Sequence, residues 1–270
     1  DTMRNTCSVF SKFYYKALAR MTSLAIQEKI TSFTLSLNPS FDLLRAIMQE
    51  YKIEPFLDYY LFNNPEFKDS YHSRLHTLIA TLDAIEGATF EKVSKRDTLC
   101  IILAMLFHDS KHSRGKYLDD VNIRVAVEDF KTAFGDSHCV KGIHPDSRDY
   151  IQATVIELIR CTKWPTPKTV SGDKPLQSIV RDADLMAIYQ NKPERLSLLV
   201  GLYNEMAYSF DDNQYTFLDN QATFATNIKW RTRWASIKSF NRNWPQCAKQ
   251  SIAELELHFR IKKNVKNIRI

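Results

Sequence analysis

Apolar residues recur along most of the chain at intervals of three and four, which is the period of an amphipathic helix. Alternation of apolar and polar residues, which marks a half-buried strand, is nowhere sustained. The 270 residues include only six glycines and nine prolines, few for a fold that needs many tight turns. The pattern therefore predicts an all-α, compact multi-helix bundle. We expect helices at about 8–33, 40–52, 70–86, 97–109, 120–133, 146–163, 175–190, 193–209, 214–238 and 246–264.

Local signals mark several of the expected helix starts. Asp97 precedes the apolar run from Leu99 to Phe107, as a capping residue would. Pro175 and Pro193 stand where first-turn prolines belong. Prolines and a glycine gather at 164–175, which predicts a loop there.

Charge and cysteine content narrow the class of protein. The net charge of +6 is spread along the chain and suits a pocket for an anionic substrate. No basic stripe with interleaved aromatic residues is present, so nucleic acid is not an expected partner. The five cysteines lie far apart and form no disulfide framework, which favours the cytoplasm or another reducing compartment. No apolar run is long enough to span a membrane.

Histidines are concentrated in two short segments. Four of the seven are His72, His76, His108 and His112, and each segment holds two that are four residues apart. On a helix this spacing would place both side chains of a pair on one face, within reach of a common centre.

The second segment follows an almost wholly apolar stretch, 100–107, which predicts a buried helix. His108 and Asp109 come directly after it. An ionised aspartate is costly to bury unless it meets a cation, and imidazole and carboxylate are natural ligands of divalent metals. The sequence thus predicts a metal site at the end of this helix.

A further ligand is expected from another apolar helix, which contains Asp182 and Asp184. Two residues that are two apart cannot share a helix face, so we expect only one to point inward. Asp184, with Val180 and Leu185 nearby, is the better candidate. The ordered set His76, His108, Asp109 and Asp184 is the predicted metal-binding group.

These residues resemble the motif of the HD superfamily of metal-dependent phosphohydrolases. Within it, Tyr71-His72 with His76, and His108-Asp109 with His112, look like motifs of class I cyclic nucleotide phosphodiesterase catalytic domains. Small HD phosphohydrolases of uncertain substrate are an equally close likeness. The resemblance covers roughly 65–225. It implies an HD-domain or phosphodiesterase-like bundle, with N-terminal helices at 1–65 packing on a catalytic core at 66–225, and a helical extension at 226–270.

The resemblance also implies roles for single residues. His76, His108, Asp109 and Asp184 would bind a first divalent ion, and Asp109 would bridge to a second; Zn, Mg, Mn and Fe are all candidates. His72 would be the general acid and His112 would orient the outer water shell. Lys111, with Arg114 and Lys116 after it, would attract the anionic substrate. Gln221 and Phe224 resemble a glutamine that reads a base and a phenylalanine that stacks on it.

Some features depart from the phosphodiesterase pattern. Only 75 residues separate Asp109 from Asp184, and Glu128 is the sole stand-in for the glutamate of a glutamate-histidine-histidine segment. The leading expectation is hydrolysis of a phosphoester in a cyclic mononucleotide or related nucleotide. The alternatives are a nucleotidase or phosphatase acting on another small phosphorylated substrate, a non-catalytic binding protein on an HD scaffold, and a di-iron oxygenase. The sequence does not indicate an oligomeric state.

Overall fold

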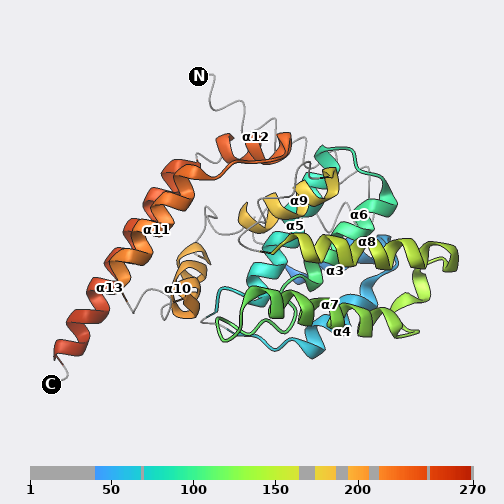
Figure 1. Ribbon diagram of the computed structural model, residues 1–270, viewed down its shortest axis with the longest axis horizontal. Coiled ribbons are helices and arrows are strands. Elements are labelled where there is room, and N and C mark those ends of the chain that lie inside the picture. Colours follow the sequence, from blue (N-terminus) through green and yellow to red (C-terminus); the bar gives the residue numbers. More distant parts are fainter. Residues whose placement is uncertain are drawn as a thin grey trace.

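The computed structural model describes residues 40–67, 70–163, 174–186, 194–206, 213–241 and 244–268. Within these ranges the regular elements are all helices and there is no strand, which confirms the predicted all-α class (Figure 1). The α-helices are α3 (Phe41–Glu50), α4 (Glu54–Asn63), α5 (Arg74–Phe90), α6 (Lys95–Phe107), α7 (Asp119–Gly135), α8 (Arg148–Cys161), α9 (Pro175–Met186), α10 (Glu194–Met206), α11 (Gln214–Asn227), α12 (Arg233–Asn241) and α13 (Trp244–Ile268). Two 3₁₀ helices, η1 (Cys139–Gly142) and η2 (Pro145–Ser147), precede α8.

Helix α6 is the centre of the bundle. Every side chain from Cys100 to Phe107 is fully buried, as the unbroken apolar run predicts. Helices α5 and α8 pack along α6, and α9 packs on α5 while also touching α6 and α8 (Figure 1). The end of α6 is therefore surrounded by protein on several sides, which allows its last residues to meet side chains from other helices.

Helices α10, α11 and α13 form a second packed group. Helix α11 runs along α13, and Tyr203 of α10 contacts both Phe217 of α11 and Phe259 of α13. In Figure 1 α11 and α13 extend away from the helices around α6. The expected division at 225–226 lies in the last turn of α11, and helices on its two sides pack against each other. That division stays a prediction.

The single helix expected at 214–238 is two helices in the structure. The range 214–238 contains α11 and α12, separated by a non-helical segment at 228–232. The backbone amides of Arg231 and Thr232 donate to the Asp182 carboxylate at 3.0 and 2.7 Å. This bond partner lies about fifty residues away in the sequence, so no local signal marks the break.

Helix α4 was not expected. Its buried residues Phe56, Leu57 and Tyr60 and its exposed Phe62 surround the helix, so no single apolar face reveals it in the sequence. The expected helix at 8–33 and Pro193 lie outside the described residues. The other expected helices are present, with α9 described as far as Met186.

The expected cap of α6 is also corrected. Ser94, rather than Asp97, is the N-cap residue: its hydroxyl accepts from the Asp97 amide at 3.1 Å and donates to the Asp97 carboxylate at 2.7 Å. Asp97 completes this reciprocal cap from within the first turn. None of the helices in the described ranges combines the length and hydrophobicity needed to cross a bilayer.

Candidate metal centre

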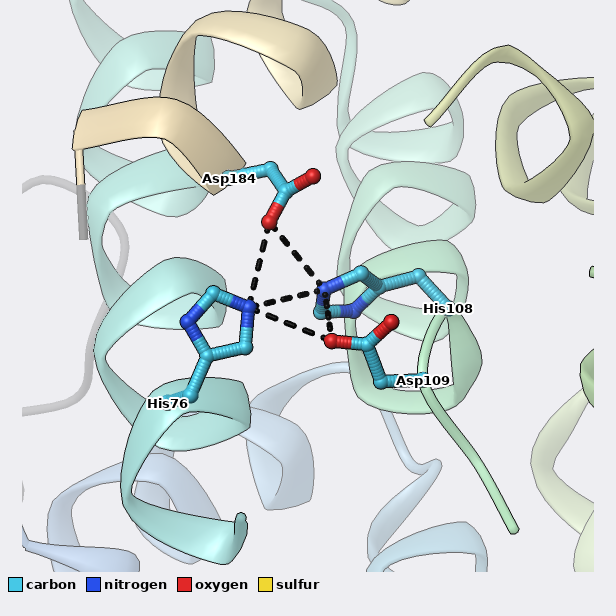
Figure 2. A group of neighbouring side chains, drawn as sticks. All are labelled: His76, His108, Asp109 and Asp184. Carbon is cyan, nitrogen blue, oxygen red and sulfur yellow. Dashed lines mark hydrogen bonds and ion pairs between the residues drawn. The ribbon is translucent and has the colours of Figure 1, made fainter. Parts of the chain in front are cut away.

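Three helix ends bring the four predicted ligands together (Figure 2). His76 lies in the first turn of α5, where the Ser73 hydroxyl caps the helix. His108 ends α6 and Asp109 follows it in a turn, while Asp184 lies in the last turn of α9. Both histidines are fully or almost fully buried. The fold thus joins residues that are up to 108 positions apart (184 − 76) in one cluster.

The four ligand atoms of this cluster are nearly equidistant. His76 Nε2 lies 3.2 Å from His108 Nε2, 3.2 Å from Asp109 Oδ2 and 3.1 Å from Asp184 Oδ1. His108 Nε2 lies 3.0 Å from Asp109 Oδ2 and 3.5 Å from Asp184 Oδ1. Nitrogen and oxygen ligands about 2.0–2.2 Å from one zinc-sized ion in tetrahedral geometry would be separated by roughly 3.3–3.6 Å. The measured spacing fits a shared cation.

The hydrogen bonds around the cluster leave lone pairs facing one another. His108 Nδ1 lies 2.7 Å from the carbonyl oxygen of Met105, which can only accept, so this nitrogen carries the proton. In neutral His108, Nε2 therefore presents a lone pair toward Asp109 Oδ2, which is buried and accepts no hydrogen bond. Two such lone pairs repel unless a positive charge lies between them.

A proton can supply that positive charge when no cation does. Burial alone would lower the pKa of His108, but the charges of Asp109 and Asp184 and their hydrogen bonds raise it well above 6.5. Conversely, burial opposes ionisation of Asp109, but His108 and His72 lower its pKa well below 3.8. Protons and a divalent metal thus compete for the same atoms. His76, His108, Asp109 and Asp184 form a group that could hold a metal ion.

A second cluster lies beside the first and consists of His72, His112 and Glu205. Potential ligand atoms of these three residues lie within 4.8 Å of one another. The rings of His72 and His112 stack with centroids 3.5 Å apart and planes at 24°. The His72 ring also lies edge-to-face with the His76 ring at 6.1 Å, so the two clusters are neighbours.

Glu205 holds His72 in place. Its carboxylate accepts from the Ser70 hydroxyl, from the His72 amide at 3.1 Å and from His72 Nδ1. Burial would lower the pKa of His72, but the charges of Asp109 and Glu205 and the bond to Glu205 raise it to about 9. His72 is therefore an imidazolium whose Nε2 makes no hydrogen bond within the described ranges.

Gly201 explains how Glu205 reaches His72. A side-chain carbon at Gly201 would lie 2.5 Å from the backbone of Ser70 and Tyr71, so only glycine lets α10 approach this segment so closely. Glu205 follows one helical turn later and shares the same face. Glu205 was not predicted from the sequence; the signal that could have found it is a single acid one turn after a glycine in an apolar helix.

His112 has protein partners at both ring nitrogens. The Arg114 amide donates to Nδ1 at 3.0 Å, and the Asn122 side-chain amide lies 2.8 Å from Nε2. Burial and the charge of His72 lower the pKa of His112 to about 3, so this ring is neutral. It holds the turn after Asp109 against α7 and supports the charged His72 ring.

The helical reason for pairing the histidines is wrong, although the residues do meet. His72 precedes α5 and lies in bent chain, while 108–111 form a turn after α6 and His112 follows it. Each pair therefore straddles a helix end. The inner members, His76 and His108, join the four-residue cluster, and the outer members stack on each other.

The expectation that only one acid of α9 points inward is also corrected. Asp184 joins the four-residue cluster as predicted, but Asp182 is buried too, with 1% of its surface exposed. Its carboxylate accepts from the amides of Arg231 and Thr232 and from the Thr232 hydroxyl at 2.8 Å. The two acids do lie on different faces, but both faces are covered in this bundle.

The remaining predicted residues lie in other surroundings. The Lys111 ammonium is paired with the buried Asp129 carboxylate at 2.6 Å. Gln221 is buried and Phe224 half-buried on α11, which packs chiefly on α13. The structure thus gives no grouping of these two with the clusters, and their base-reading role stays a prediction. Glu128 is exposed and pairs with Lys131 at 2.8 Å, so it is not the acid that serves a histidine here.

Comparisons with protein families and with curated sequences identify no relative. No protein-family model matches the chain, and no curated protein sequence matches it significantly. The two clusters and the motif resemblance are therefore the observations that bear on function.

Proposed function

We propose that this protein is a metal-dependent hydrolase of phosphoesters, in which His72 acts as the general acid. The observation that supports this most is the adjacency of two differently equipped clusters. One has four converging ligand atoms, of which Asp109 Oδ2 accepts no hydrogen bond, and the other has a charged histidine held by a glutamate. Metal binding and proton donation together can promote hydrolysis of a phosphoester.

His76, His108, Asp109 and Asp184 would hold the metal. A bound divalent cation would supply a low-pKa water and neutralise charge on phosphoryl oxygens. The donor set of two imidazoles and two carboxylates suits Zn, Mn or Fe, and Mg would require additional water or substrate oxygens. Asp109 also has its second carboxylate oxygen, which could reach a second ion as the HD resemblance implies.

His72 is suited to protonate the leaving oxygen. Its Nδ1 is held by Glu205, which fixes the ring and leaves the proton on Nε2 available to a substrate. The stacked, neutral His112 ring limits rotation of His72 without competing for the proton. We therefore assign His112 to positioning of His72, in addition to the water-orienting role that the resemblance implies.

The substrate class follows from this assignment. A general acid matters most when the leaving group is a poor one, such as the alkoxide of a sugar hydroxyl. A nucleotide phosphoester, including a cyclic mononucleotide, has such a leaving group and carries the negative charge that a chain of net charge +6 attracts. A phosphatase or nucleotidase for another small molecule would use the same groups. Turnover of a panel of different phosphoesters therefore decides between these activities.

The test is metal analysis of the purified protein, with turnover of a panel of cyclic and linear nucleotides and nucleoside monophosphates. Wild type, Asp109→Ala and the control Asp219→Ala are compared. Asp219 is exposed on α11, and its substitution removes the same charge as Asp109→Ala. We expect bound metal and turnover in wild type and control, and neither in Asp109→Ala. Full activity without Asp109 would overturn the proposal, as would a folded wild type that binds no divalent metal.

A further inference from the structure

The loop that follows Asp109 is held in an unusual backbone conformation. Lys111 and Arg114 have φ angles of 55° and 54°, in the left-handed region that residues other than glycine seldom adopt. The Lys111 amide donates to Asn64 at 2.7 Å, and the Ser113 amide donates to Asn122 at 3.1 Å. Backbone strain of this kind persists only where the surroundings enforce it. These contacts fix the backbone position from which the Arg114 side chain extends.

The Arg114 guanidinium is half-buried without a carboxylate partner. It lies over the ring of Phe67, and its Nε is buried and makes no hydrogen bond within the described ranges. No side-chain ion pair of Arg114 is found there either. A guanidinium has five N–H donors, and leaving one buried and unpaired is unfavourable. Such a donor can form a hydrogen bond with an acceptor that is not part of the chain.

Glu205 is an acid whose charge acts on Arg114. Burial lowers the pKa of Arg114, and the charge of Glu205 partly opposes that effect, so the two groups are within electrostatic range. However, the Glu205 carboxylate is already taken by Ser70 and His72. The backbone amide of Arg114 contacts the His112 ring of this cluster, and its buried side-chain Nε makes no hydrogen bond within the described ranges.

We propose that Arg114 binds phosphate oxygens of the substrate beside His72. The planar guanidinium fork matches two oxygens of one phosphate and forms strong charge-assisted bonds with them. Phe67 supplies a flat support that holds the fork in one plane. Lys111 cannot do the same while its ammonium is paired with Asp129. The assignment of a substrate depends on the proposed hydrolase function, but the binding of phosphate can be measured without turnover.

The experiment compares wild type with Arg114→Gln, Arg114→Lys and the matched control Arg124→Gln. Arg124 is exposed on α7, and its substitution removes the same charge by the same chemical change. Affinity for inorganic phosphate and for pyrophosphate is measured by calorimetry, with metal content and thermal melting recorded for each protein. We expect Arg114→Gln to bind phosphate about 10- to 100-fold more weakly, with unchanged metal content, and Arg124→Gln to change affinity less than about twofold.

Equal phosphate affinity in Arg114→Gln and Arg124→Gln would overturn the proposal. If Arg114→Gln does not fold, Arg114→Lys keeps the charge and still removes the fork, and an undiminished affinity in that variant would also overturn it. A similar loss for both ligands identifies the reacting phosphate as the bound group, whereas a larger loss for pyrophosphate identifies a neighbouring one. A protein that binds phosphate through Arg114 but hydrolyses nothing would refute the hydrolase function alone.

Discussion

Two neighbouring clusters of similar composition differ in how completely their polar atoms are paired. In the cluster of His76, His108, Asp109 and Asp184, Asp109 Oδ2 and His76 Nδ1 are buried without a hydrogen bond. In the cluster of His72, His112 and Glu205, no buried polar side-chain atom lacks a partner within the described ranges.

This difference separates binding a cation from orienting a side chain. The four ligand atoms lie at nearly equal spacing, and Asp109 Oδ2 among them is buried without a hydrogen bond, so the cluster favours an added positive charge. The three-residue cluster already has such a charge, because His72 is protonated and Glu205 accepts several bonds. Composition alone would class both clusters as candidate metal sites, whereas the hydrogen bonding of their polar atoms supports different roles for them.

The largest effect should come from comparing His76→Ala with His72→Ala. These histidines are four residues apart, so the two variants are matched in residue type and region. We expect His76→Ala to weaken metal binding by more than about 100-fold, since even residues that only hydrogen-bond to a metal ligand contribute about 10–100-fold. His72→Ala should retain its metal but lose turnover. Metal analysis after dialysis checks this, and equal metal loss in both variants would erase the distinction between the clusters.

A smaller effect is expected from Glu205→Gln. The amide can still accept a bond but no longer stabilises the charged His72 ring, so kcat should fall about 100-fold with little change in metal content. Turnover with a 4-nitrophenyl ester, whose leaving group needs no proton, should fall far less than turnover with an alkyl phosphoester. An equal loss for both esters would mean that Glu205 does not act through proton donation.

The fold class and the residues of the four-residue cluster could be predicted because each signal is local. The apolar run 100–107 requires burial, and a histidine and an aspartate at its end are readable without knowledge of the remaining fold. The periodicity also gave most helices within a few residues. It failed at α4, whose apolar residues surround the helix, and at 228–232, where a distant carboxylate ends the helical path.

Residues that depend on contacts between helices were harder to predict. Glu205 acts only because Gly201 lets α10 approach the Ser70 backbone, and the sequence shows neither this approach nor its direction. The pairing of His72 with His112 was expected to arise from helical faces but arises from a stack between two helix ends. Asp182 was expected to face outward because the start of α12, which covers it, is about fifty residues away.

Asp182→Ala tests whether complete pairing marks a structural role. This acid is two residues from Asp184, yet its oxygens accept hydrogen bonds from the backbone at the start of α12. Removing it leaves buried amides unpaired, so we expect a loss of about 2–3 kcal/mol and a decrease in melting temperature of about 5–10 °C, with metal retained. Asp184→Ala should show the reverse: metal lost from a protein that otherwise melts like metal-free wild type.

The smallest effect should come from Asn122→Ala, which removes one of the two partners of His112 and the acceptor of the Ser113 amide. The ring would still accept from the Arg114 amide and stack on His72, so its position should shift little. We expect a loss of about 1 kcal/mol in stability and less than about tenfold in turnover, with unchanged metal stoichiometry. A loss of turnover as large as that of Glu205→Gln would instead show that the contacts of Asn122 with His112 and with the Ser113 amide, and not the stack, set the geometry of His72. The contacts that hold His72, the proposed general acid, would then extend from Glu205 through His112 to α7.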